Sequence, residues 1–135
     1  MKIFSRNAVR GMAAGGVLLV AMGSTAAYAG GSTSTKLDNG RLYFEAHNGR
    51  DIGQSSSKVY WGEKYTKTGG SPVTAQLTAV MEGGEYKGNR HTVKKGQSIT
   101  FSWSAPVSRA EDCTITGIMI TDAKRYQTPW IENVC

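Results

Sequence analysis

Residues Val73–Met81 read VTAQLTAVM, and this stretch decides the fold class. Its apolar side chains fall on every second position, and the positions between them begin with Thr74, Gln76 and Thr78. A period of two is typical of a half-buried β-strand, whereas a helix would repeat its apolar positions every three to four residues. The stretch therefore predicts a strand with one face in a hydrophobic core.

Segments on both sides of this stretch also favour short strands separated by turns. In Ser98–Ser104, SITFSWS, the apolar residues alternate with serine and threonine, and we expect this strand to be the central hydrophobic anchor. Cys113–Thr121 is apolar on both faces, which is typical of an interior strand. Further strands are expected at residues 41–46, 58–65, 90–94 (at an edge) and 126–134. About seven strands predict a small immunoglobulin-like antiparallel β-sandwich over residues 41–135, with a small barrel as the alternative.

Residues 1–29 have the layout of a secretory signal peptide. Lys2, Arg6 and Arg10 make its start positive. The apolar run Gly16–Met22 is too short to span a bilayer, and Ala27–Ala29 supplies a small-x-small cleavage pattern. Its removal takes three of the six excess positive charges and leaves a net charge of +3. We therefore expect a secreted, extracellular protein without a membrane segment.

Cys113 and Cys135 both lie in the exported part of the chain, where the compartment is oxidising. Two cysteines allow one intramolecular pairing, so a disulfide between them is expected. The chain-entropy model gives such a ring roughly 3 kcal/mol of stabilisation. The bond would hold the C-terminal tail in place, and the lack of a CxxC motif favours this structural role over redox chemistry.

Residues 30–40 differ in composition from the strands that follow. The run GGSTSTK, Gly30 to Lys36, is small and polar without apolar periodicity, which predicts a flexible arm. Such an arm could be a spacer after the signal peptide, or it could add to a partner's sheet or lie in its cleft together with the strand Leu42–Ala46. The partner-binding residues expected on this basis are Gly30, Gly31, Ser32, Thr33, Ser34, Thr35, Lys36, Leu37, Leu42 and Phe44.

Few residues of the sequence point to catalysis or to metal binding. His47 and His91 are the only histidines, and neither lies in an HExxH motif or at the spacing of a zinc site. Motifs for a nucleophile elbow and for a phosphate loop are also missing. Glu45 and Glu63 could form the carboxylate pair of a glycosidase, but solvent-facing charges are the expected role. We expect a protein that is not an enzyme, with no cofactor and no metal.

A basic cluster lies next to Tyr86 and comprises Lys87, Arg90, His91, Lys94 and Lys95. It could meet phosphates while the tyrosine stacks on a base, as in proteins that bind single strands. However, a net charge of +3 gives a weak field, and lysines at an edge strand commonly prevent edge-to-edge pairing. We therefore expect no nucleic-acid partner.

The layout of the chain resembles that of a known family. A signal peptide is followed by the polar arm GGSTSTKLDNG, by a small β domain containing GQSITFSW and CTITGIMI, and by a cysteine at the very end. This layout is similar to that of the small adaptor subunits of secreted actinobacterial umbrella toxin particles. Those adaptors join a lectin subunit to the stalk of a large toxin subunit. The resemblance implies a non-enzymatic linker whose residues 30–46 insert into the lectin partner.

We thus expect a secreted protein-binding module. The resemblance implies that this module is an adaptor in an antibacterial toxin complex. Two alternatives stay open. A secreted protease or hydrolase inhibitor would present a rigid loop, His47–Gly53 or Ala105–Asp112, to an enzyme cleft. A carbohydrate-binding module would stack sugars on the aromatic run Tyr60, Trp61 and Tyr65, although alternation would place Trp61 in the core.

Overall fold

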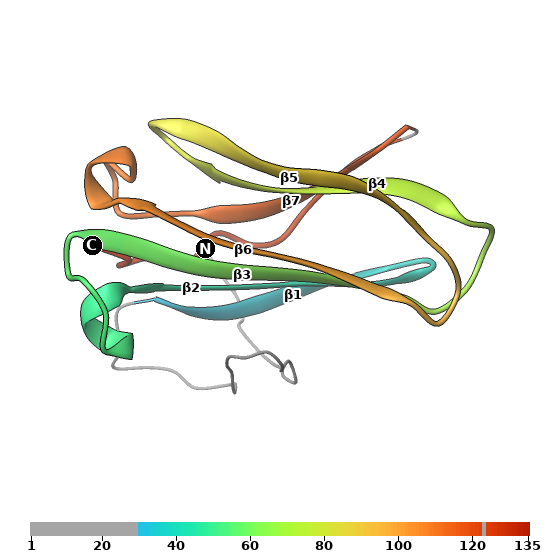
Figure 1. Cartoon of the computed structure of the whole chain (residues 1–135), viewed down its shortest axis with the longest axis horizontal. Coiled ribbons are helices and arrows are strands. Elements are labelled where there is room, and N and C mark those ends of the chain that lie inside the picture. The colour runs from blue at the N-terminus through green and yellow to red at the C-terminus, as the bar shows by residue number, and fades with distance from the viewer. Residues whose placement is uncertain (1–29, 123) are drawn as a thin grey trace.

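The computed structural model describes residues 30–122 and 124–135 of the 135-residue chain, so the expected signal peptide lies outside the described residues. Within them, eight strands form two four-stranded antiparallel sheets that pack face to face (Figure 1). One sheet has the order β1-β2-β3-β6 and the other the order β5-β4-β7-β8. The predicted small antiparallel β-sandwich is confirmed.

The first sheet consists of β1 (Gly31–Leu37), β2 (Gly40–Asn48), β3 (Lys58–Lys67) and β6 (Ser98–Pro106). The second sheet consists of β4 (Val73–Met81), β5 (Gly84–Val93), β7 (Thr116–Thr121) and β8 (Arg125–Gln127). Two short 3-10 helices, η1 (Gly49–Ile52) and η2 (Val107–Arg109), lie with the C-terminus at one end of the sandwich (Figure 1).

The chain crosses between the sheets three times, from β3 to β4, from β5 to β6 and from β6 to β7. As a result, β3 pairs with β6 in one sheet and β4 pairs with β7 in the other. These pairs correspond to strands B and E and strands C and F of an immunoglobulin domain. The period of two in Val73–Met81 is borne out, since Ala75, Leu77 and Met81 of β4 are buried.

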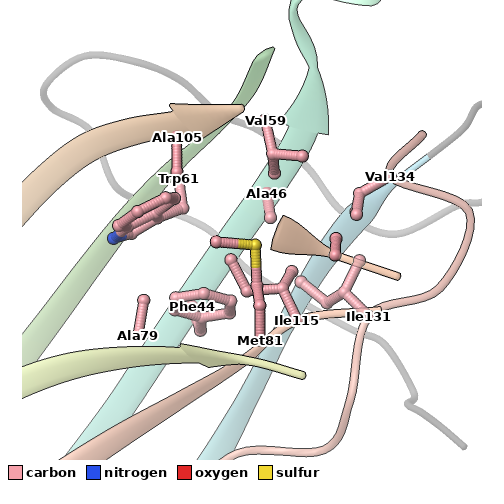
Figure 2. Packing of buried hydrophobic residues seen from close by; sticks show 11 residues of the cluster. Phe44, Ala46, Val59, Trp61, Ala79, Met81, Ala105, Ile115, Ile131 and Val134 are labelled. Carbon is pink, nitrogen blue, oxygen red and sulfur yellow. The ribbon is translucent and has the colours of Figure 1, made fainter. Parts of the chain in front are cut away.

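The core lies between the sheets in two clusters. The larger gathers side chains from both sheets around Phe44 and Trp61, and Figure 2 shows them directed toward one another. The smaller is built around Leu42 and Leu77. β7 contributes to both faces of its sheet, because Thr116 to Met119 are all buried, as expected of an interior strand.

The disulfide joins Cys113 to Cys135 as expected, with the two Cα atoms 5.1 Å apart. It closes the end of the sandwich rather than linking the two sheets at their centre. The Val134 backbone N–H donates to the Cys113 carbonyl at 3.0 Å, and Ile115 forms an isolated bridge with Ile131. The expected last strand at residues 126–134 is therefore wrong in extent, since β8 has three residues and the rest is held by single contacts.

Residues 31–37 are strand β1, so the expectation of a flexible arm is wrong. They pair with β2 from Gly31↔Ala46 to Leu37↔Gly40. The Thr35 hydroxyl also donates to the Gln127 carbonyl of β8 at 3.0 Å, which ties the two sheets together. Small polar residues can form this strand because backbone hydrogen bonds to a neighbouring strand need no apolar periodicity.

Candidate functional site

Strand β6 ends its sheet and pairs on one side only, with β3. Its sequence, SITFSWSAP, contains no charged side chain. The register is regular from Lys58↔Pro106 to Thr66↔Ser98, so no bulge bends this edge away from solvent. The strand does pack Ile99 and Phe101 against the core, but it lies at the edge and not at the centre. The expectation of a central anchor is therefore corrected.

Trp103 of β6 is 61% exposed, more than any other large apolar side chain in residues 30–122 and 124–135. Its cross-strand neighbour Trp61 is only 4% exposed. The Trp61 ring is covered by Tyr86 of β5 and by Phe101 of β6, at centroid distances of 5.3 and 6.3 Å. Trp103 lies on β6, which is one strand closer to the edge of the sheet than β3. The facing sheet ends at β5, so no further strand of the described fold covers Trp103. An exposed tryptophan on an apolar strand is typical of a binding surface.

The other three sheet edges carry features that discourage pairing with another chain. β1 holds the exposed Lys36 and is tied to β8 by the hydrogen bond from Thr35. β5 bears Lys87 and Arg90 and an irregular ladder with β4, while β8 has three residues. Charges, bulges, proline and shortness are the usual protections of sheet edges, and of these β6 has only Pro106, at its last position. We call β6 with Trp103 the open edge.

The basic cluster of Lys87, Arg90, His91, Lys94 and Lys95 lies along β5 and the turn after it, and all five side chains are exposed. Of the expected edge strand at residues 90–94, residues 90–93 belong to β5, which is an edge strand, and Lys94 lies in the turn after it. β5 and β6 are in close contact, since a Cβ at Gly88 would lie 3.1 Å from the Phe101 ring. Lys94 and Lys95 therefore lie in the turn directly before β6, whereas the β4–β5 register places Lys87 and Arg90 on the outer face of β5.

Glu63 is an unexpected feature of the core. Its side chain is 2% exposed on the inward face of β3, between Trp61 and Tyr65. Within the described residues neither carboxyl oxygen has a partner at standard hydrogen-bond geometry, although the Thr78 backbone N–H lies close enough to interact with the carboxyl. Burial raises the pKa of Glu63 well above its ordinary value, and the Thr78 backbone N–H lowers it only in part. Thr78 lies where the β4–β5 ladder is irregular.

Glu45 and Glu63 do not form a carboxylate pair. In the β2–β3 register Glu63 is opposite Phe44, and Glu45 is opposite Gly62, so the two side chains leave opposite faces of the sheet. Glu45 instead lies 3.0 Å from His47 on the outer face. The expectation that both charges face solvent is wrong for Glu63. The sequence does contain a signal for its burial, because Glu63 alternates with Trp61 and Tyr65 and therefore shares their inward face of β3.

Three of the residues expected to bind a partner belong to this domain's own core. Leu42 and Phe44 are at most 1% exposed, and Thr33 is 4% exposed, so their assignment to a partner surface is corrected. The others lie along β1 or directly before it: Gly30, Gly31, Ser32, Ser34, Thr35, Lys36 and Leu37. Lys36 is exposed and the rest are half-buried, and their contact with a partner stays a prediction.

The residues of the two alternative functions are placed as follows. Trp61 and Tyr65 are buried, so they do not form a stacking platform with the half-buried Tyr60. The loop His47–Gly53 contains η1 and exposes Ile52 by 45%. The loop Ala105–Asp112 has buried alanines at both ends of η2 and presents less apolar surface.

Searches for other kinds of site and for relatives complete the description. In residues 30–122 and 124–135, no group of three or more His, Cys, Asp or Glu side chains could hold a metal ion. The same ranges contain no helix with the length and apolar character needed to cross a membrane. No protein-family model matches the chain, and no curated protein or solved structure is significantly similar to it.

Proposed function

We propose that the chain is a secreted, non-catalytic binding module that joins extracellular proteins, with the open edge as a contact surface. The observation that carries this proposal is the 61% exposure of Trp103 on an uncharged edge strand. Tryptophan is strongly enriched at binding hot spots, because its large ring gains much free energy when a partner removes it from water. The strand is already formed, so binding costs little ordering entropy.

The resemblance to umbrella toxin adaptors gives this proposal a specific form. A lectin subunit and a large toxin subunit are then the partners, within an antibacterial particle. An adaptor needs two separate contact surfaces, and the sandwich offers two opposite sides. β6 and β5 form one side, and β1 and β8, joined through Thr35 and Gln127, form the other. Each side would contact one partner.

The proposal is tested by capture of the tagged protein from the culture supernatant of the producing organism, followed by mass spectrometry. A stoichiometric extracellular partner is expected with the native sequence and with Trp130→Ala, which removes a tryptophan that is 38% exposed elsewhere. Trp103→Ala should lose that partner or retain much less of it. A protein that stays monomeric and captures nothing under these conditions would overturn the proposal.

A protease or hydrolase inhibitor is a second candidate, because the loop around η1 is both exposed and held. Ile52 is 45% exposed, while the Asn48 side chain accepts from the Arg50 N–H and donates to the Ser56 carbonyl. A fixed loop with an apolar tip is suited to an enzyme cleft. Titration of secreted proteases with the native protein and with Ile52→Asp tests this role, which requires loss of inhibition in the variant.

A further inference from the structure

The open edge has the properties of a template for an added strand. β6 pairs with β3 over nine positions in a regular register, and its other side has no strand beside it in the described fold. Along such an edge, alternate backbone N–H and C=O groups point away from the sheet and can pair with an extended segment. The apolar face of that segment would meet Trp103.

The charge beside the open edge determines what kind of segment fits. Between Tyr86 and Gln97 the chain holds Lys87, Arg90, Lys94 and Lys95 and no acidic residue. Glu85, directly before this stretch, is paired with Arg125 at 3.7 Å. The end of an added strand that lies beside Ser98 would be next to Lys94 and Lys95 in the turn before β6, so carboxylates are favoured in that segment.

A second copy of the chain is a poor occupant of this edge. If two β6 strands paired around a two-fold axis, the two sheets containing β5 would also meet edge to edge. The basic cluster of one copy would then face the same cluster of the other, and like charges placed in this way oppose association. The open edge is therefore suited to a different protein.

From these observations we infer that β6 accepts an extended, acid-rich segment of a partner protein as a fifth strand of the β1-β2-β3-β6 sheet, with Trp103 as its apolar anchor. This inference rests on the proposed function, since it presumes a protein partner, and it adds the mode of binding and the chemistry of the bound segment. Backbone pairing supplies affinity, and the basic cluster selects acidic sequences.

The test uses nine-residue peptides, capped at both ends and labelled with fluorescein, whose anisotropy is measured with the purified protein. The first peptide alternates valine with glutamate and the second alternates valine with lysine. A third repeats the first with every backbone nitrogen methylated, which removes the N–H donors from both of its edges. We expect the first to bind at least about tenfold more tightly than the other two, with an affinity that falls as salt is added.

Matched variants assign the binding to the open edge. Trp103→Lys, which puts a charge on the edge strand, should weaken the glutamate peptide at least about tenfold, whereas Trp130→Ala should leave it unchanged. Lys94→Glu with Lys95→Glu, in the turn directly before β6, should reverse the preference between the two charged peptides. Lys36→Glu with Lys124→Glu makes the same charge change at the opposite side of the sandwich, near β1 and β8, and should have no such effect.

Three results would overturn the inference. One is equal binding of the methylated peptide, which would show attraction by charge without strand pairing. Another is a β6-dependent dimer in analytical ultracentrifugation, which would make a second copy the occupant. The third is capture of the supernatant partner by Trp103→Lys as well as by the native protein, which would leave the chain a binding module but move its contact surface away from this edge.

Discussion

Trp61 and Trp103 are directly opposite each other in the β3–β6 ladder, yet one is 4% exposed and the other 61%. Both lie on the inward side of the same sheet, so the difference comes from the facing sheet. Tyr86 of β5 covers Trp61, and no strand of the described fold lies beyond β5 to cover Trp103. The same residue type is thus a core side chain on one strand and a surface side chain on the next.

This contrast predicts different effects on stability from the same substitution. Trp61→Ala should lower the free energy of unfolding by about 3–5 kcal/mol, because it empties part of the larger core cluster. Trp103→Ala should change it by less than about 1 kcal/mol, since the exposed ring buries little surface. Urea unfolding followed by circular dichroism measures both values. Equal losses would show that Trp103 is covered in solution.

The buried Glu63 predicts that stability falls as the pH rises. In the unfolded chain its carboxyl ionises near its ordinary pKa of 4.5, whereas in the native state burial raises the pKa and the proton is retained. Between these two pKa values the unfolded state binds fewer protons, so the free energy of unfolding falls by about 1.4 kcal/mol per pH unit. Below pH 4.5 this contribution is constant.

Glu63→Gln removes the titrating group and tests this relationship. The variant should lose the fall above pH 4.5 and should be more stable than the native protein at neutral pH. Glu82→Gln, in the exposed turn between β4 and β5, is the matched control and should keep the native pH profile. Urea midpoints at a series of pH values provide the comparison, and an unchanged slope in Glu63→Gln would assign the pH dependence to other groups.

Strands whose apolar and polar side chains alternate cleanly can be predicted from the sequence. The exposure of their side chains cannot be predicted where it depends on which strands lie next to them in the fold. Val73–Met81 lies in the middle of its sheet, so its apolar period directly reflects the core. Ser98–Ser104 alternates equally well, but alternation gives the face of a residue and not the distance of its strand from the edge. The exposure of Trp103 therefore follows only from the strand order.

Glu63 and β1 show two other limits of prediction from sequence. A glutamate is expected in solvent because burying its charge is costly, and only the alternation with Trp61 and Tyr65 indicates the inward face. β1 has no apolar period, because its stability comes from backbone pairing with β2. The candidate site, formed by β5 and β6 from different sheets, depends on a crossover that no local motif encodes.

The pairing of β1 predicts that deleting residues 30–37 destabilises the domain. The deletion removes the ladder from Gly31↔Ala46 to Leu37↔Gly40 and uncovers the edge of β2. Each lost backbone hydrogen bond contributes about 0.5–1.5 kcal/mol, so the urea midpoint should fall markedly relative to a chain that begins at Gly30. An unchanged midpoint would mean that these residues act as a free arm in solution.

The disulfide predicts a second loss of stability that reduction can reproduce. Replacing Cys113 and Cys135 by serine should lower the free energy of unfolding by about 3 kcal/mol, because the open chain regains the entropy of a loop with a sequence separation of 22. The native protein in dithiothreitol should approach the stability of this double variant. The double variant itself should not respond to dithiothreitol, which controls for effects of the reductant on other groups.

The close approach of β2 to β7 predicts that Gly117 cannot be replaced by a larger residue without cost. A Cβ at this position would lie 2.5 Å from Cδ1 of Phe44, whose ring is 1% exposed and packed between the sheets. Gly117→Ala should therefore destabilise the domain by about 1–3 kcal/mol, as overpacking does. Gly62→Ala is the matched control, because a Cβ there meets only the Ser102 hydroxyl, at 3.5 Å.

The double variant Gly117→Ala with Phe44→Leu separates the clash from other effects of the alanine. Leucine lacks the ring that the new methyl group meets, so the two changes together should cost less than the sum of their separate costs. Urea unfolding of the two single variants and the double variant gives this coupling energy. Strict additivity would mean that the sheets move apart by themselves to admit the methyl group, and that the contact does not fix their spacing.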